Sequence, residues 1–388
     1  MSIIGKWYKE FKQTEIGKIP KEWEVVRLGE IFSLEYGKGL TEKERENGEY
    51  PVYGSNGVVG YHSQYIVKGP GIIVGRKGTI GAITWSNRNF WPIDTTYYIL
   101  LKKPETDLKW LFYKLSSLKL AKLNMATGTP GLNRDLVYKL QIPLPPLPEQ
   151  QKIAEILSTV DAAIEKVDEA IAKTERIKKG LMQELLTKGL PVASATQTGI
   201  GHKEFKNTEI GRIPKEWEVV RLGEVFSLEY GKGLTEKERE NGEYPVYGSN
   251  GVVGYHSQYI VKGPGIIVGR KGTIGAITWS DRNFWPIDTT YYILLKKHKT
   301  VLKWLFYKLS SLKLAKLNMA TGTPGLNRDL VYKLKLPLPP LPEQKKIAEI
   351  LSTVDKRLVL LRNKKERLGR VKKGLMNDLL TGKKRVVL

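Results

Sequence analysis

Residues 128–157 read GTPGLNRDLVYKLQIPLPPLPEQQKIAEIL, and residues 322–351 read GTPGLNRDLVYKLKLPLPPLPEQKKIAEIL. The offset of 194 residues that relates them aligns Lys9 with Lys203 and Asp161 with Asp355 without a gap. Ten positions of the first copy differ across this span, namely 13, 18, 31, 87, 104, 105, 107, 141, 142 and 151. A repeat of this length is a duplicated domain, because solenoid repeats are much shorter. Each copy is therefore expected to fold alone, around its own core.

A proline run and a long helix end each copy. Pro143, Pro145, Pro146 and Pro148 exclude a helix interior and a central strand, so an extended connector is expected there. Apolar residues then recur at alternating steps of four and three, which predicts a heptad seam on a helix from about residue 148 to 187. The seam consists of Ile153, Leu157, Val160, Ile164, Val167 and Ile171, and of Ile347, Leu351, Val354, Leu358, Leu361 and Leu368 in the second copy.

Two such helices in one chain are expected to cover each other's seams. Residues 161–180 contain five acids and five bases, whereas residues 355–374 contain two acids and nine bases. A helix rich in acids and a basic helix prefer each other over themselves, which favours an antiparallel coiled coil within the chain. Homodimerisation through one seam remains the alternative, because a and d residues do not determine the oligomeric state alone.

The globular part of each copy has an α+β pattern. Residues 23–101 alternate β-branched and aromatic runs with Gly, Asn and Pro clusters, which predicts strands, and residues 108–123 are expected to form one helix. The expected organisation is a globular domain (1–147), a helix (148–189), a linker (190–207), a second globular domain (208–341) and a second helix (342–382). The two mixed α/β domains are expected to lie in an inverted pseudo-two-fold arrangement.

The charge of the chain predicts a polyanionic partner. Its 64 Lys and Arg outnumber its 40 Asp and Glu, giving a net charge of +24, which favours nucleic acid, with an acidic lipid surface as the alternative. Cysteine is absent, which excludes disulfides and thiolate sites and is typical of a reducing compartment. No run reaches the roughly 18 apolar residues that a membrane helix needs. We therefore expect a cytoplasmic protein without a membrane partner.

The segment LPPLPEQQKIAEIL followed by a heptad helix, repeated after two globular units, resembles the specificity (S) subunit of type I restriction-modification systems. The resemblance covers nearly the whole chain. It implies two target-recognition domains that each read one half of a bipartite double-stranded DNA site, with the helix pair setting the gap. It also implies partners: modification subunits that use S-adenosylmethionine, and restriction or motor subunits that use ATP and Mg. No cofactor is then expected in this chain.

The near identity of the two copies departs from that family, in which the two recognition domains normally differ. It predicts that both half-sites share one sequence in inverted orientation, as an interrupted palindrome. A recent gene conversion or an engineered duplication is the competing explanation.

Candidate DNA-binding residues are the polar and basic side chains of the predicted loops, because these residue types bind base edges and phosphates. The first copy offers Lys38, Lys43, Ser55, Asn56, His62, Gln64, Arg76, Lys77 and Thr79, and the second Lys232, Lys237, Ser249, Asn250, His256, Gln258, Arg270, Lys271 and Thr273. Turn chemistry explains some of them without DNA, since Asn56 before Gly57 suits a tight hairpin.

The segment before the connector offers small donors for phosphate. These are Thr127, Thr129 and Asn133, with Thr321, Thr323 and Asn327 in the second copy. A capped turn leading into a strand is the alternative interpretation of the same residues.

No motif predicts catalysis. The sequence GPGIIVGRKGT lacks the G-x-x-x-x-G-K-[ST] spacing of a phosphate-binding loop, and the four histidines form no metal-ligand pattern. We therefore expect a non-enzymatic chain with neither catalytic nor metal-binding residues. The alternative function is a tandem adaptor that binds RNA or another partner, which stacked aromatic side chains would favour.

Overall fold

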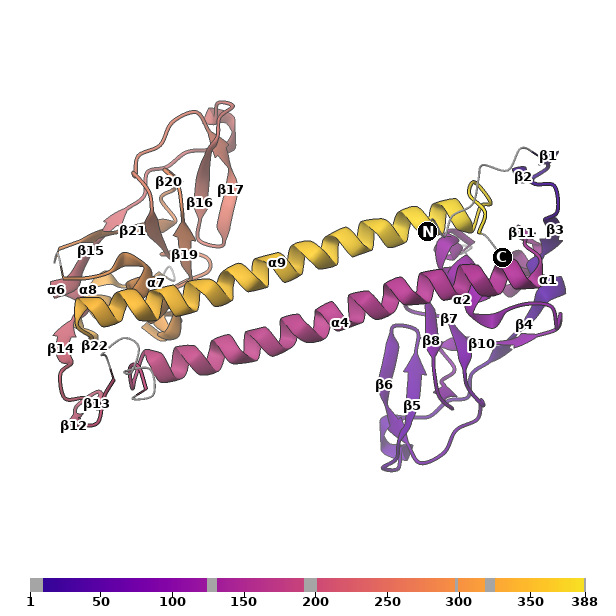
Figure 1. The fold of residues 1–388 in the computed structure, drawn as a ribbon, viewed down its shortest axis with the longest axis horizontal. Helices are drawn as coiled ribbons and strands as arrows, with labels where there is room; N and C mark the ends of the chain where they lie inside the picture. Colours follow the sequence, from indigo (N-terminus) through magenta and orange to yellow (C-terminus); the bar gives the residue numbers. More distant parts are fainter. Residues whose placement is uncertain (1–9, 124–130, 192–200, 297–298, 318–324, 387–388) are drawn as a thin grey trace. The chain divides into compact units, whose positions relative to one another are not determined.

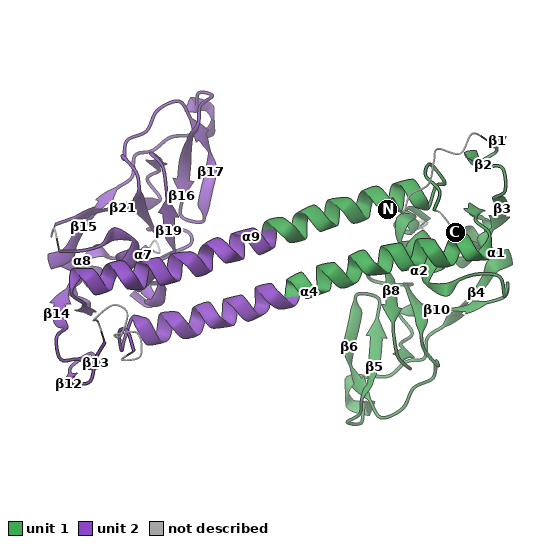
Figure 2. Cartoon of the chain, in the orientation of Figure 1, with its two compact units in different colours: residues 1–168, 363–388 green, residues 169–362 purple. Residues whose placement is uncertain are grey.

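The computed structural model describes residues 10–123, 131–191, 201–296, 299–317 and 325–386 (Figure 1). They form two compact units, described separately below. Unit 1 contains residues 1–168 and 363–388, and unit 2 contains residues 169–362 (Figure 2). Each unit therefore combines the globular part of one repeat with a portion of both long helices.

Most strands of unit 1 precede its helices, as predicted, but the short helix Leu28–Ile31 and the strand Gln141–Leu144 depart from that order. The elements are β1 (Phe11–Thr14), β2 (Gly17–Pro20), β3 (Glu24–Arg27), α1 (Leu28–Ile31), β4 (Phe32–Tyr36), η1 (Glu42–Glu44), β5 (Tyr50–Gly54), β6 (Gly57–His62), β7 (Gly71–Gly75), β8 (Ile83–Ser86), β9 (Trp91–Pro92), β10 (Thr96–Leu101), α2 (Leu108–Ser117), η2 (Leu120–Leu123), α3 (Arg134–Lys139) and β11 (Gln141–Leu144). The first long helix, α4, spans Leu147–Leu185.

Unit 2 repeats this order. Its elements are β12 (Phe205–Thr208), β13 (Gly211–Pro214), β14 (Glu218–Arg221), α6 (Leu222–Val225), β15 (Phe226–Tyr230), η4 (Glu236–Glu238), β16 (Tyr244–Gly248), β17 (Gly251–His256), β18 (Gly265–Gly269), β19 (Ile277–Ser280), β20 (Trp285–Pro286), β21 (Thr290–Leu295), α7 (Leu302–Ser311), η5 (Leu314–Leu317), α8 (Arg328–Lys333) and β22 (Lys335–Leu338). The second long helix, α9, spans Leu341–Leu379.

The strands of unit 1 form small sheets. The largest has the antiparallel order β4-β10-β7-β8, and β5 lies between β6 and β9 in a second sheet. The proline-rich connector is more ordered than expected, because Gln141–Leu144 pairs with β3 and places Pro143 opposite Val25. Since this sheet has only two strands, both are edge strands, where proline is tolerated.

The helix expected at residues 108–123 is shorter in the structure. α2 ends at Ser117, Leu118 is extended, and a separate 3₁₀ turn follows. The Ser116 and Ser117 hydroxyls donate to the carbonyl oxygens of Phe112 and Lys114, so serine side chains bind the last turn of the helix. The apolar spacing predicted the helix but not its end.

The core of unit 1 contains residues from both repeats. Trp23 and Trp110 are fully buried there, together with Leu157 of α4 and with Leu379 and Leu380 at the end of α9. The core of unit 2 likewise contains Leu185 and Leu186 from the end of α4. The expectation that each copy encloses its core alone is therefore wrong, because helix ends from the other repeat complete it.

A buried lysine binds the end of the exchanged helix in each unit. The Lys114 ammonium donates to the carbonyl oxygen of Leu380 at 2.9 Å, and Lys308 donates to that of Leu186 at 2.9 Å. Burial lowers the pKa of both ammonium groups to about 8. A cation beside the last carbonyl groups of a helix compensates an unpaired acceptor and the negative end of the helix dipole.

The two long helices pack in antiparallel directions within each unit. In unit 1, Lys372 pairs with Asp161 and Lys365 with Asp168, both at 2.6 Å. In unit 2, Arg362 pairs with Glu175 at 2.7 Å, and Asp355 pairs with Lys178 at 2.6 Å.

The predicted seam residues are all withdrawn from solvent. Ile153, Leu157, Val167, Ile347, Leu351 and Leu358 are buried, and Val160, Ile164, Ile171, Val354, Leu361 and Leu368 are half-buried. The predicted intramolecular coiled coil is confirmed.

Candidate nucleic-acid interface

Several of the predicted DNA-binding residues meet at one rim of the four-stranded sheet in unit 1. The antiparallel register places Tyr36 of β4 opposite Tyr97 of β10, so the loop after β4 and the loop before β10 meet. The backbone N–H groups of Lys38 and Arg76 donate to the carbonyl oxygens of Pro92 and Thr95, both at 2.9 Å. The sheet register and these bonds place Lys38, Arg76 and Lys77 together.

The β5–β6 turn joins this rim. The Ser55 hydroxyl accepts a hydrogen bond from the Thr79 backbone N–H at 3.3 Å, which ties the turn to the loop that follows β7. Asn56 is exposed at the turn, and Gly57 after it has a φ of 106°, which favours glycine. Turn chemistry therefore accounts for Gly57, while the Asn56 side chain is free to face a ligand.

Aromatic and arginine side chains form the centre of the rim. The guanidinium groups of Arg76 and Arg134 each lie 5.3 Å from the ring centroid of Tyr36, which is exposed. Arg76 Nε and Nη2 also donate to the Asp94 carbonyl oxygen, so its orientation is set by the protein. Tyr97 lies behind Tyr36 with a ring-centroid distance of 5.1 Å. Burial, reinforced by Tyr36, raises the pKa of Tyr97 to about 12.

Asn133 positions one of these arginines. Its side-chain oxygen accepts hydrogen bonds from the backbone N–H groups of Asp135 and Leu136, at 2.9 and 3.2 Å, as the N-cap of α3. The helix begins at Arg134, and the Leu132 N–H donates to the Arg76 carbonyl oxygen. These contacts favour the capped-turn interpretation of this segment. Thr127, Thr129, Thr321 and Thr323 lie outside the described residues.

The other candidates lie elsewhere. Lys43 is exposed in η1, and Gln64 is exposed in the loop after β6. His62 is buried, its Nδ1 accepts from the Glu46 N–H at 3.0 Å, and its ring packs against Trp91. Trp91 Nε1 donates to the Lys38 carbonyl oxygen at 2.8 Å, so His62 supports the rim from behind.

Unit 2 contains the same rim. Arg270 and Arg328 each lie 5.3 Å from the Tyr230 ring centroid, and Tyr291 lies 5.1 Å behind it. The corresponding loop and cap residues are Lys232, Lys271, Ser249, Asn250, Thr273 and Asn327. His256 is buried like His62, whereas Lys237 and Gln258 are exposed.

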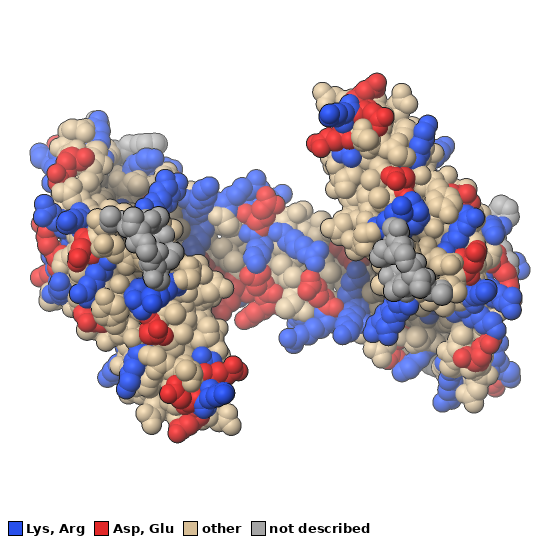
Figure 3. All heavy atoms as spheres, turned by 180° about the vertical axis from the view of Figure 1, so that it is seen from behind, with Lys and Arg blue, Asp and Glu red and all other residues tan. Residues whose placement is uncertain are grey.

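The sequence-based interpretation missed Tyr36, Tyr97 and Arg134. A tyrosine that ends a strand and an arginine that follows a helix cap were the available signals, but neither is specific. Lys and Arg side chains are spread over both units in the view of Figure 3, so charge alone does not distinguish the rim.

Comparison with known proteins identifies the family. The family model described as the type I restriction modification DNA specificity domain matches residues 20–175 and 214–370, one match for each repeat. The chain belongs to this family. It is a type I specificity subunit, and such subunits are not catalytic, because the reactions belong to partner subunits. This finding favours the specificity-subunit interpretation over the RNA or adaptor alternative.

Relatives that are named specificity subunits match this chain along its whole length. The type I restriction enzyme MjaVIII specificity subunit of Methanocaldococcus jannaschii is 31% identical, covering 100% of this chain and 99% of the relative. A putative MjaX specificity subunit from the same organism is 29% identical, covering 100% of both. The crystal structure of an S subunit from M. genitalium has the same fold, with a TM-score of 0.72 at 19% identity over 98% of this chain and 99% of that one. No helix of the described residues has the length and apolarity to cross a membrane.

Proposed function

We propose that each unit of this specificity subunit binds one half of a bipartite double-stranded DNA site through its tyrosine–arginine rim. The observation that carries this proposal is the exposed Tyr36 between Arg76 and Arg134, repeated at Tyr230 with equal distances. Guanidinium groups bind phosphates and guanine edges, and an oriented guanidinium loses little entropy on binding. Lys38 and Lys77 add phosphate contacts, and Asn56 reaches toward base edges.

The same residues in both rims support equal half-sites. Two rims with the same residues recognise the same DNA sequence, so the target is an interrupted palindrome with the half-sites inverted. A binding-site selection with the full chain would return one half-site twice. Recovery of two unrelated half-sites would contradict this assignment.

The reactions belong to partners. Modification subunits, using S-adenosylmethionine, and restriction or motor subunits, using ATP and Mg, assemble with this chain in the cytoplasm.

The rim can be tested by single and combined substitutions. Sequencing the modified bases in the host genome would first provide the target motif. Arg134→Ala and Arg328→Ala are each expected to weaken binding to that duplex by about tenfold, and the combined variant by the product of the two. Each lost phosphate contact is also expected to lower, by about 1, the magnitude of the slope of the logarithm of the binding constant against the logarithm of the salt concentration.

The matched control is Lys43→Ala combined with Lys237→Ala, which removes two exposed cations from η1 and η4. It is expected to keep most of the sequence-specific affinity. A larger loss in this control than in the arginine variants would place the DNA on another face.

A further inference from the structure

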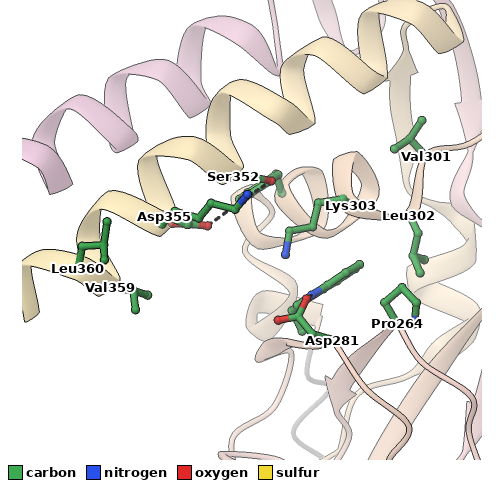
Figure 4. Close-up of a pocket in the computed structure, with 12 residues that line it drawn as sticks. Pro264, Asp281, Val301, Leu302, Lys303, Ser352, Asp355, Val359 and Leu360 are labelled. Atoms are coloured by element: carbon green, nitrogen blue, oxygen red, sulfur yellow. Dashed lines mark hydrogen bonds between the residues drawn. The ribbon is translucent and has the colours of Figure 1, made fainter. Parts of the chain in front are cut away.

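Unit 2 contains an open groove of about 870 Å³ between the globular part and α9 (Figure 4). Trp279, Lys303 and Tyr307 line the globular side, and Lys356, Val359 and Leu360 line the helix side. The groove shares no lining residue with the tyrosine–arginine rim.

Two large apolar side chains are left uncovered beside this groove. Val359 is 53% exposed and Leu360 is 68% exposed, in a helix whose exposed face is rich in Lys and Arg and also includes Val371. Neither residue belongs to the coiled-coil seam, which contains Leu358 and Leu361 instead. A cluster of exposed apolar residues rimmed by charged residues is typical of a protein-binding site.

The equivalent surface of unit 1 has different residues. Seven of the twelve lining residues are the same in both repeats, and five differ. The differing pairs, unit 1 first, are Asn87 and Asp281, Asp107 and Val301, Ala162 and Lys356, Glu165 and Val359, and Lys166 and Leu360. Three of these five changes place an apolar side chain where unit 1 has a charged one. Two of the five changes, at positions 281 and 301, lie in the nearly identical globular part, and the other three lie in α9 after Asp355, where the two repeats differ at most positions.

One of these changes removes a structural contact. The Asp107 carboxylate accepts a hydrogen bond from the Trp110 backbone N–H at 2.7 Å and caps α2. Val301, the N-cap residue of α7, makes no side-chain capping hydrogen bond. Loss of an N-cap destabilises a helix, so the valine weakens α7 while adding apolar surface to the groove.

The charges of the groove favour an acidic partner. Asp355 is neutralised internally, since Lys178 pairs with it at 2.6 Å and the Tyr307 hydroxyl donates to it at 2.7 Å. Lys356 makes no ion pair with any residue that the structure describes. Lys303 lies 3.9 Å from the Trp279 ring centroid, and burial is the main cause that lowers its pKa. Asp281 also lines the groove, accepts a hydrogen bond from Trp279 Nε1 at 2.5 Å and interacts electrostatically with Lys303. Lys356 is therefore the lysine of the groove that remains available to carboxylates.

We propose that this groove binds one acidic amphipathic α-helix of a protein partner, and that unit 1 has no equivalent site. The apolar face of the helix covers Val359 and Leu360, and its carboxylates face Lys356. A second copy of this chain is disfavoured, because two basic α9 surfaces would repel each other. The two units are then alike at the tyrosine–arginine rim and different at this groove.

The test uses the full chain and a labelled synthetic helical peptide of 18 residues, with leucine on one face and glutamate on the other. Fluorescence anisotropy is expected to show one peptide per chain. A peptide of the same pattern with lysine in place of glutamate is expected to bind at least tenfold more weakly.

Exchange of residues between the repeats provides matched variants. Val359→Glu with Leu360→Lys installs the unit 1 residues in unit 2 and is expected to weaken binding at least tenfold, with unchanged circular dichroism. Asp107→Val with Ala162→Lys, Glu165→Val and Lys166→Leu installs the groove in unit 1 and is expected to create a second site.

Four results would overturn the proposal. They are no binding of the glutamate peptide, two equal sites in the unmodified chain, peptide binding that the Val359 and Leu360 substitutions leave unchanged, and displacement of the peptide by duplex DNA. Self-association of the chain that the same substitutions abolish would identify a second copy as the occupant and also refute it.

Discussion

Nε2 of His202 lies 2.8 Å from Oε1 of Glu343 within unit 2. In unit 1 the matching carboxylate, Glu149, is instead held by Nε of Arg385. Both carboxylates are buried, and both accept a hydrogen bond from a buried tryptophan Nε1, Trp217 or Trp23. The repeated residues are the same, but the linker supplies the partner in one unit and the C-terminal segment supplies it in the other.

Arg385→Ala is expected to destabilise unit 1 by about 3 kcal/mol, because removing one member of a buried ion pair leaves the other charge uncompensated. His202→Ala is expected to destabilise unit 2 by about 1–3 kcal/mol. Hydrogen exchange of peptides from residues 363–379 reports on unit 1 and that of peptides from residues 169–185 reports on unit 2, because the two helices differ in sequence there. An equal increase in hydrogen exchange in both units for either variant would contradict this assignment.

Lys114 makes the stability of unit 1 dependent on pH. Its folded pKa of about 8 lies below the ordinary value of 10.5, so the unfolded chain binds more protons between these values. The free energy of unfolding is therefore expected to rise with pH across this window, by on the order of 2–3 kcal/mol relative to Lys114→Met. Urea unfolding of both proteins at pH 7.5 and pH 10 measures this difference. A pH-independent difference would show that the ammonium is not desolvated.

Gly37 is the first residue after β4, in the loop that forms part of the rim, and this position requires glycine. A Cβ atom there would lie 2.1 Å from the Ile93 carbonyl oxygen, whereas a Cβ at Gly39 would meet nothing within 4 Å. Gly37→Ala is expected to cost about 2 kcal/mol or more and to weaken DNA binding, because it displaces Tyr36 and Lys38. Gly39→Ala is the control and is expected to change stability by less than about 0.5 kcal/mol. Thermal unfolding and DNA titration of both variants would check this, and similar behaviour of the two would disprove the steric explanation.

The ion pair between Asp161 and Lys372 is expected to couple the two long helices modestly. Both side chains are about one-third exposed, which limits the coupling to about 0.5–1 kcal/mol in a double-mutant cycle. Asp161→Ala should cost more than Lys372→Ala, because Asp161 also accepts the Tyr113 hydroxyl at 2.8 Å. Urea unfolding of the four proteins gives the coupling energy, and a zero value would mean that the pair is fully screened by solvent.

The amino-acid sequence was sufficient for the features that depend on local or repeated patterns. The duplication, the strand-rich globular parts, the two heptad helices and the family resemblance all follow from spacing and identity along the chain. The charge difference between the helices also predicted their pairing, because complementary charges select a partner without detailed geometry.

Tertiary structure alone decided which distant residues meet. Tyr36, Arg76 and Arg134 come together because sheet register and a helix cap join three separate loops. Leu379 enters the core of unit 1 because the antiparallel helix returns there, and no pattern near either residue records that contact. Periodicity describes one element at a time, whereas a binding rim or a shared core depends on packing between elements that lie far apart in the sequence.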